Sequence, residues 1–183
     1  MTDCASVERG RNVEKMAVTV RAASADDAQT VVKIINAGWQ AAYVGMVPQA
    51  YLDSLSDNFR GHIRDDIASG RLSVLLLLED GVPAGIVGFG KSRDGSLADW
   101  GEIDCLYVRP GFCRRGYGKT LLCAAVDALA QHGFRDCFLW VLEENRNARE
   151  FYSAMGFRAT EDVTHSEIMG KCLTEVRYCF SMK

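Results

Sequence analysis

A glycine-rich, basic loop occupies residues 111–120, with the sequence GFCRRGYGKT. Gly116 and Gly118 let main-chain amides approach a ligand closely, because neither residue carries a side chain that would intervene. Basic side chains surround the two glycines: Arg114, Arg115 and Lys119. Amides and cations together favour an anion, and a pyrophosphate would suit this loop. A tight turn with solvated arginines is the simpler alternative, because a Gly-x-Gly pair also occurs in ordinary turns.

The segments on either side of this loop favour the anion site. Apolar patterning predicts a strand that ends at Val108 and a helix that begins near Tyr117. The N-terminus of that helix contributes unpaired N–H groups and about half a positive charge. The loop therefore lies where a strand gives way to a helix, a place suited to phosphate groups.

The end of the loop also resembles a nucleotide-triphosphate loop, Gly-x-x-x-x-Gly-Lys-[Ser/Thr]. Gly118, Lys119 and Thr120 fit that pattern, but Cys113 stands where its first glycine should be. An aspartate-ending strand is present in VLLLLED, residues 74–80, yet it precedes the loop, whereas nucleotide hydrolases place it afterwards. Its acids lead into a turn, where such acids are usually solvated. The sequence therefore disfavours ATP or GTP as the ligand.

Hydrophobic periodicity along the rest of the chain predicts one α/β domain with a mixed sheet. Tight turns at residues 80–81 and 94–95 join three strands into an antiparallel meander. A helix separates the third strand from the fourth, so these two strands can run parallel. The predicted strands are Val18–Arg21, Ser73–Glu79, Ala84–Lys91, Leu97–Val108, Phe138–Leu142, Phe157–Thr164 and Thr174–Phe180.

Capping residues locate the predicted helices between these strands. The helices begin near Ser24, Pro48, Asp57, Tyr117 and Asn147, and Phe59, Ile63 and Ile67 give the third one its helical spacing. GWQAAYVGM, residues 38–46, breaks the helical pattern of the segment before it, and Asn147 with Glu150 resembles a capping pair.

Composition limits the remaining possibilities. The 183 residues suffice for one domain, with residues 1–16 as a disordered tail and 17–183 folded. A net charge of −3 gives no support to a nucleic-acid partner, and no apolar run is long enough to cross a membrane. The seven cysteines are odd in number and form no Cys-x-x-Cys pair, which favours reduced thiols and a cytoplasmic location. No metal is expected, because the three histidines, His62, His132 and His165, lie far apart.

Two longer motifs resemble the GNAT superfamily of acetyl-CoA-dependent N-acetyltransferases. LYVRPGFCRRGYGKTLL, residues 106–122, resembles the family's pyrophosphate loop, and ENRNAREFYSAMGF, residues 144–157, resembles its Asn-x-x-Ala-x-x-Phe-Tyr-x-x-x-Gly-Phe helix. The order of elements from Val18 to Phe180 is also the family's. The resemblance implies the acyl-CoA N-acyltransferase fold, in which a mostly antiparallel sheet contains a splayed parallel pair and is flanked by helices. Residues 17–183 would then be a single N-acetyltransferase domain.

The same resemblance implies where acetyl-CoA binds. The pantetheine arm would lie between the two splayed strands and pair with backbone groups of one of them, and Asn145 would bond the arm. Cys113 departs from the motif's opening Arg or Gln, and the neighbouring arginines would supply the charge instead. The implied cofactor-binding residues are Leu106, Tyr107, Val108, Arg114, Arg115, Gly116, Tyr117, Gly118, Lys119 and Asn145.

Acetyl transfer to an amine needs a base, an oxyanion donor and an acid for the departing thiolate. Glu102 is the candidate base, because an alternating strand would point it the same way as Asp104, Leu106 and Val108. Asp104 is the reserve base. Another branch of the family has a base glutamate at the position of Trp140, so that route is closed here.

Tyr152 is the candidate acid, because it resembles the family tyrosine beside the cofactor sulfur. The backbone amide near Val108 is the expected oxyanion donor. A polar strand end for Glu102 and a core tyrosine for Tyr152 are the alternatives that the sequence leaves open.

The acceptor is expected to be a primary amine of a small molecule, an amino acid or a peptide. Three aromatic residues either line its pocket or belong to the core: Trp39, Tyr43 and Tyr51. A homodimer is possible, because members of this family often pair. A non-catalytic acyl-CoA sensor that kept only the cofactor slot remains the competing function.

Overall fold

The computed structural model describes residues 16–55 and 62–182. The expected tail over residues 1–16 therefore lies outside the described residues, apart from Met16. The predicted cap at Asp57 and the helical position of Phe59 also fall outside them.

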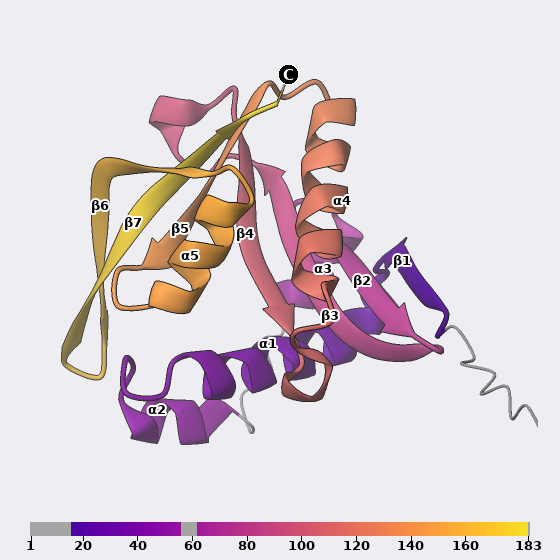
Figure 1. Cartoon of the computed structure of the whole chain (residues 1–183), viewed down its shortest axis with the longest axis horizontal. Helices are drawn as coiled ribbons and strands as arrows, with labels where there is room; N and C mark the ends of the chain where they lie inside the picture. The colour runs from indigo at the N-terminus through magenta and orange to yellow at the C-terminus, as the bar shows by residue number, and fades with distance from the viewer. Residues whose placement is uncertain (1–15, 56–61, 183) are drawn as a thin grey trace, which may run out of the picture.

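A seven-stranded sheet forms the centre of the molecule (Figure 1). Its strand order is β1-β2-β3-β4-β5-β7-β6. The predicted meander is confirmed, because β2, β3 and β4 are antiparallel neighbours. The strands are β1 (Val18–Ala22), β2 (Ser73–Glu79), β3 (Val82–Lys91), β4 (Gly101–Val108), β5 (Asp136–Leu142), β6 (Arg158–Ile168) and β7 (Lys171–Ser181).

The strands β4 and β5 form the parallel pair of this sheet, and they stay together for only two residues. Gly101 pairs with Cys137 and Glu102 pairs with Phe138, and β4 and β5 do not pair with each other beyond these residues. Past this point the two strands diverge, as the splayed pair expected from the sequence requires. The backbone groups that face the gap are left without a strand partner, which makes the gap a place where a ligand can pair.

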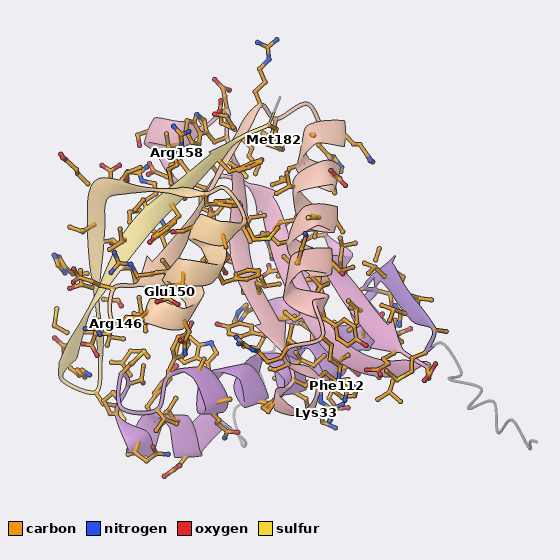
Figure 2. The ribbon with its side chains drawn as sticks, in the orientation of Figure 1. Lys33, Phe112, Arg146, Glu150, Arg158 and Met182 are labelled. Carbon is orange, nitrogen blue, oxygen red and sulfur yellow. The ribbon has the colours of Figure 1, made fainter. Side chains whose placement is uncertain are left out.

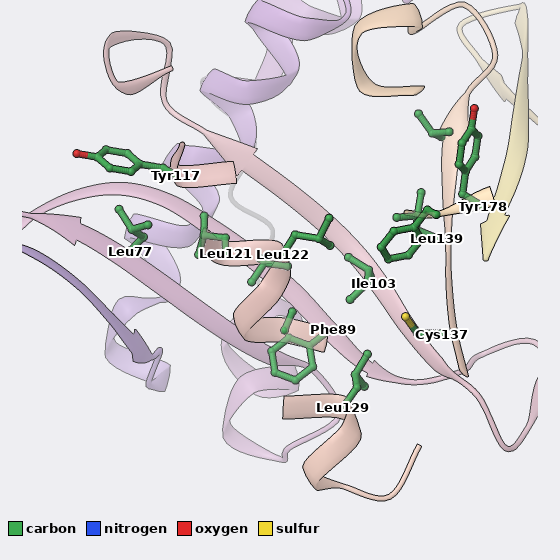
Figure 3. Packing of buried hydrophobic residues seen from close by; sticks show 14 of the residues in the cluster. Leu77, Phe89, Ile103, Tyr117, Leu121, Leu122, Leu129, Cys137, Leu139 and Tyr178 are labelled. Atoms are coloured by element: carbon green, nitrogen blue, oxygen red, sulfur yellow. The ribbon is translucent and has the colours of Figure 1, made fainter. Parts of the chain in front are cut away.

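Helices cover both faces of the sheet. The helix α4 (Tyr117–Gln131) packs Leu121, Leu122, Ala125 and Leu129 onto one face (Figure 3). The helix α5 (Arg146–Ala154) adds Ala148 and Phe151 to the edge of the same core. The opposite face is covered by α1 (Ala28–Ala42) and α3 (His62–Ala68), with the short helix α2 (Gln49–Ser54) beside them.

Three predictions of local structure were wrong. The segment from Gly38 does not break the helix, because α1 continues through Ala42. The strand predicted from Leu97 begins only at Gly101, because residues 95–97 form a 3-10 turn capped by Asp94. The cap of α5 is Asn145 and not Asn147, because the Asn145 Oδ1 accepts the Ala148 N–H at 3.1 Å.

Gly38, in the middle of α1, lies where the helix packs closely against β4. A Cβ on Gly38 would collide with the ring of Tyr107 on β4. The backbone of α1 therefore lies directly against this ring and fixes it at the inner face of the helix. In this way α1 positions a side chain of the strand that ends at the glycine-rich loop.

We predict that Gly38→Ala destabilises the fold by roughly 1–3 kcal/mol, because the added methyl overpacks against the base of the Tyr107 ring. Urea unfolding measures the change. At a helix position free of this contact, the same substitution would stabilise by roughly 1 kcal/mol through helix propensity. A stabilised variant would contradict the close approach of α1 to Tyr107.

Candidate active site

A β-bulge in β4 decides which side chains reach which face of the sheet. Ile103 pairs with Phe89 and Cys105 pairs with Gly88, so Asp104 is the extra residue. The expectation that Glu102, Asp104, Leu106 and Val108 share one face was therefore wrong. Ile103, Leu106 and Val108 pack with the α4 core, whereas Cys105 and Tyr107 pack toward α1.

The backbone of β4 beyond the bulge presents hydrogen-bonding groups to the gap. The Arg109 N–H donates to the Ala84 carbonyl at 2.9 Å, which makes these two residues a hydrogen-bonded pair of the β3–β4 ladder. Alternation then places Leu106 and Val108 at non-hydrogen-bonded positions of that ladder. Their N–H and C=O groups point away from β3, toward β5, where the parallel pairing has ended.

The gap between β4 and β5 is a slot of about 310 Å³. It brings together most of the residues that the sequence assigned to the cofactor arm and to catalysis. The lining from β4 and β5 is residues 103–108 and 139–142, and Asn145, Ala148, Phe151, Tyr152 and Gly118 close the side toward α4 and α5.

The glycine-rich loop has the backbone shape expected of an anion site. Gly116 has a φ of 83°, which a glycine adopts without strain, and Arg114 has a φ of 64°. No side chain caps the N-terminus of α4, and its first intrahelical bond runs from the Thr120 N–H to the Gly116 carbonyl. The N–H groups of residues 117–119 therefore remain available to a ligand.

The basic residues of the loop divide into two kinds. Arg114 and Lys119 are exposed beside the helix N-terminus and can meet a phosphate. Arg115 instead donates to both carboxylate oxygens of Glu79, at 2.7 and 2.9 Å, and its guanidinium lies 5.4 Å from the centroid of the Phe112 ring. Figure 2 labels Phe112 in the loop before α4. Arg115 thus ties the loop to β2.

The partner of Arg115 was misjudged from the sequence. Glu79 was expected to be a solvated turn residue, but its side chain is 5 % exposed. The phenol of Tyr117 also contacts it, and burial followed by Glu79 raises the pKa of that phenol. Glu79 therefore holds the first residue of α4 and the loop arginine together, which fixes the loop relative to the sheet.

Tyr152 lies on α5 and lines the slot. Its ring packs against Phe151, with centroids 5.2 Å apart, and no hydrogen bond to its hydroxyl is found among residues 16–55 and 62–182. Burial, with smaller contributions from Tyr43 and Cys105, raises the pKa of the Tyr152 phenol well above its usual value. The phenol therefore stays protonated at neutral pH and can act as a donor toward the slot.

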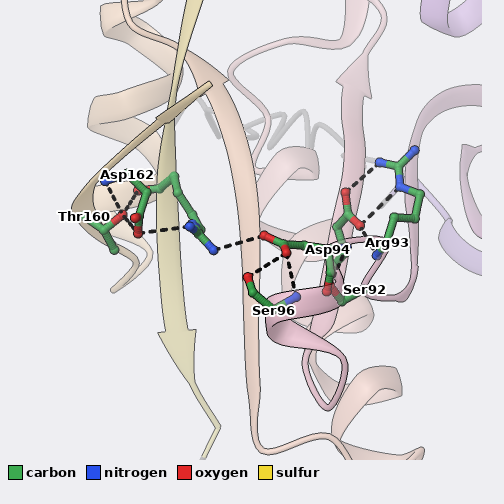
Figure 4. Close-up of polar contacts among 8 residues, drawn as sticks. Ser92, Arg93, Asp94, Ser96, Thr160 and Asp162 are labelled. Carbon is green, nitrogen blue, oxygen red and sulfur yellow. Dashed lines mark hydrogen bonds and ion pairs between the residues drawn. The ribbon is translucent and has the colours of Figure 1, made fainter. Parts of the chain in front are cut away.

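Glu102 does not reach this slot. Both of its oxygens accept hydrogen bonds from Arg93, one from the Arg93 main-chain N–H at 3.0 Å and the other from Nη2 at 2.6 Å (Figure 4). The Arg93 guanidinium also forms an ion pair with Asp104. One exposed arginine therefore joins the predicted base and its reserve.

Glu102 opens instead onto a second cavity of about 740 Å³, on the α1 and α3 side of the sheet. Trp39 and Ile63 line it from the helices, and Arg93 lines it from the loop after β3. The two cavities share three lining residues, Asp104, Cys105 and Tyr107. The bulge is therefore the place where a group in the second cavity would meet the slot.

Two polar residues of the slot, Tyr43 and Glu175, were absent from the predicted site residues, and Tyr107 was expected to act only through its backbone. The Tyr43 and Tyr107 hydroxyls lie 3.4 Å apart, and Glu175 comes from β7. Burial raises the pKa of both phenols, so both are neutral donors. Only the aromatic character of Tyr43 signalled it in the sequence; Glu175 gave no signal, because its place beside the slot depends on pairing between β5 and β7.

Comparison with known proteins identifies the family of this chain. The sequence pattern of the Acetyltransferase (GNAT) family matches residues 35–157. The chain belongs to the GNAT acetyltransferase family. It is thus an acetyl-CoA-dependent acetyltransferase, as the two motifs predicted, and the slot and loop fit the arm and pyrophosphate of that cosubstrate.

The match to each of two curated relatives covers nearly the full length of that relative. The chain is 32 % identical over 161 residues to the uncharacterized N-acetyltransferase YuaI of Bacillus subtilis, covering 87 % of this chain and 90 % of the relative. It is 24 % identical over 157 residues to the spermidine N(1)-acetyltransferase of Thermoplasma acidophilum, covering 84 % and 96 %.

Solved structures share the fold. The PaiA N-acetyltransferase of Thermoplasma acidophilum in complex with coenzyme A superposes with a TM-score of 0.71 at 20 % identity, over 87 % of this chain and 98 % of that one. The acetyltransferase YncA of Salmonella typhimurium with acetyl-CoA gives 0.68 at 20 % identity, over 91 % and 95 %.

Substitutions of Asn145 can separate an effect on protein stability from an effect on coenzyme A binding. The Oδ1 of Asn145 accepts the capping hydrogen bond of α5, and its amide NH₂ is the group that we expect to donate to the cofactor. We predict that Asn145→Ser, which keeps a capping oxygen, weakens coenzyme A binding several-fold with little change in melting temperature. Asn145→Ala should lower both the affinity for coenzyme A and the stability of the protein, the latter by roughly 1 kcal/mol. Calorimetric titration with coenzyme A and thermal unfolding measure the two effects; unchanged affinity in Asn145→Ser would remove this residue from the cofactor site.

Proposed function

We propose that this enzyme transfers an acetyl group from acetyl-CoA directly to a primary amine. The observation that carries this proposal is the slot itself, into which an unpartnered Tyr152 and the backbone of Leu106 and Val108 are directed. Acetyl-CoA supplies a thioester whose carbonyl carbon accepts a nucleophile. Loop amides 117–119, with Arg114 and Lys119, would hold its pyrophosphate.

Three groups of the chain would act on the reacting atoms. A base removes a proton from the acceptor ammonium, which leaves nitrogen with the lone pair that forms the new C–N bond. The Val108 N–H donates to the carbonyl oxygen as negative charge develops there. As the tetrahedral intermediate collapses, the nitrogen loses its second proton to solvent and Tyr152 gives its proton to the sulfur as the C–S bond breaks. The phenolate is then reprotonated from solvent.

Glu102 remains the proposed base, with Asp104 or a water as the alternatives. Arg93 occupies both Glu102 oxygens, so proton transfer requires one of these hydrogen bonds to be exchanged for one to the amine or to a bridging water. The shared border of the two cavities at Asp104 supports this route, because it brings a group bound near Glu102 to the edge of the slot.

A non-catalytic acyl-CoA sensor is the second candidate. The engagement of Glu102 and Asp104 by Arg93 favours it, because neither carboxylate is free in this arrangement. Thiol release from acetyl-CoA, measured across a panel of polyamines, amino acids and peptide amines, separates the two functions. We include spermidine because one relative is named for it. Turnover with any amine supports the enzyme; tight coenzyme A binding without turnover on the whole panel supports the sensor.

We also propose that the protein acts in the cytoplasm and forms a homodimer. No helix within residues 16–55 and 62–182 has the length and apolar content of a membrane span. The six cysteines that the structure describes are free thiols. Sedimentation equilibrium tests the dimer, and a monomer at micromolar concentration would contradict it.

We predict that Tyr152→Phe lowers turnover by about 10²-fold, because the thiolate then leaves without a positioned proton donor. The coenzyme A dissociation constant should stay within a few-fold, since the ring packing is kept. Tyr51→Phe is the matched control, because Tyr51 lines neither cavity and its loss of a hydroxyl should leave turnover unchanged. Wild-type turnover in Tyr152→Phe would exclude this residue from the chemistry.

We predict that Glu102→Gln shifts the pH profile of activity toward higher pH. Without the carboxylate, the reaction depends on acceptor that is already neutral, and this fraction is about one in a thousand at pH 7 for an amine of pKa near 10 and rises with pH. Initial rates between pH 6 and about 10 measure the shift. Glu161→Gln, an exposed carboxylate on β6, controls for loss of charge. A profile that coincides with the wild type would refute the base assignment.

A further inference from the structure

The polar lining of the slot is acidic. Its side chains include the carboxylates of Asp104 and Glu175, two asparagines and the phenols of Tyr43, Tyr107 and Tyr152, but no lysine, arginine or histidine from the described part of the chain. Asp104 is compensated by its ion pair with Arg93. Glu175 therefore carries the charge of the slot that the protein itself leaves uncompensated.

The position of Glu175 follows from the register of the sheet. On β7 it pairs with Leu142 of β5 on one side and with Thr164 of β6 on the other. It lies at the end of β5 where β4 has already diverged, which places it at the mouth of the slot. Its side chain is partly buried, and no hydrogen bond or ion pair to its carboxylate is found within the described chain.

The neighbouring cation does not neutralise this carboxylate. Arg177 lies two residues further along the same face of β7, but its guanidinium is held elsewhere. It contacts Asp162 at 3.1 Å and Asp94 at 3.4 Å, and both of these carboxylates are labelled in Figure 4. The guanidinium also lies over the Trp140 ring, 5.0 Å from its centroid. These contacts turn Arg177 toward the loop before β4 and leave Glu175 without a partner.

A partly buried, unpaired carboxylate costs free energy unless a ligand compensates it. Aromatic rings beside it make a cation the suitable ligand, because the ring faces attract positive charge. Tyr43 approaches from the end of α1 and Tyr107 from β4, and the charge of Glu175 contributes to the raised pKa of the Tyr43 phenol.

We propose that Glu175 binds the acceptor as a cation at the mouth of the slot and so selects alkylammonium acceptors over neutral amines. This inference rests on the proposed acetyl transfer for its biological meaning, but the binding it describes does not depend on turnover. The carboxylate would accept hydrogen bonds from the ammonium while Tyr43 and Tyr107 surround the carbon chain. Glu175 is thus a specificity-determining residue, distinct from the proposed base.

The charge state of Glu175 sets a direction for pH. Burial raises its pKa above the usual glutamate value, so the carboxylate takes up a proton at a higher pH than an exposed glutamate does. Cation binding should therefore weaken as pH falls through this raised pKa. The titratable groups that line the slot together with Glu175 are Tyr43 at the end of α1, Asp104, Cys105 and Tyr107 on β4 and Tyr152 on α5, and Arg177 is the charged neighbour on its own strand.

The test compares two aromatic amines of similar size that differ in charge. Benzylamine is protonated at pH 7.5 and carries a positive charge, whereas aniline is neutral at this pH. NMR titration of the coenzyme A-loaded protein gives their dissociation constants without requiring turnover. We expect wild type to bind benzylammonium more tightly than aniline. Glu175→Gln should weaken benzylammonium binding about tenfold and leave aniline unchanged, because a charged hydrogen bond is lost. Glu175→Asp should give an intermediate loss.

Glu167→Gln is the matched control, because it removes the same charge from an exposed position on β6. It should leave both affinities unchanged. Equal affinity of wild type for the two amines, no binding of either one, or equal losses in Glu175→Gln and Glu167→Gln would overturn the proposal. So would a weaker coenzyme A affinity in Glu175→Gln, because it would assign the carboxylate to the cofactor. Absence of thiol release with every amine would count against the proposed acetyl transfer. It would not decide whether Glu175 binds the ammonium, because the NMR titration measures that binding independently of turnover.

Discussion

The site depends on hydrogen bonds that the sheet does not make. The parallel strands β4 and β5 pair at Gly101 and Glu102 and then separate, although both continue for several residues. A buried backbone group without a partner is costly, so a sheet that opens in its interior needs water or a ligand to pair with the edges of the opening. The slot is the result, and its walls are a strand edge that a cofactor arm can extend as a further strand would.

The separation is maintained by packing on both faces. On one face, α4 and α5 bury Leu121 and Phe151 against the diverging strands; on the other, α1 lies against the Tyr107 ring so closely that only glycine fits at position 38. The bulge at Asp104 connects the two faces, because a single extra residue turns Glu102 toward α1 and Leu106 toward α4. A small register change thus gives one strand a side that faces the slot and a side that faces the second cavity.

Local motifs made part of this site predictable. The loop glycines and the helix carrying Asn145 and Tyr152 are each contiguous in sequence, so their resemblance to family motifs was enough to predict that they lie beside one cleft. Features that depend on distant pairing were not predictable. Glu79 meets Arg115 across 36 positions of sequence, and Glu175 reaches the slot only because β7 pairs with β5. Gly38 was taken as a helix breaker, since the ring that requires it belongs to a strand about 70 residues away.

Charge is distributed unevenly along the slot. In the proposed function, the two substrates would therefore bind at opposite ends of it. At the α4 end, exposed amides, Arg114 and Lys119 provide a positive field, which is where a diphosphate belongs. At the β7 end, Glu175 provides a negative charge that no cation lining the slot from residues 16–55 and 62–182 compensates, and aromatic rings line the slot with it. An anionic donor and a cationic acceptor would therefore be drawn to opposite ends of one channel, with Tyr152 between them. Because the two fields oppose each other, a reversed orientation of either substrate would place like charges together. In the proposed function, the same residues that attract the substrates would therefore also align them.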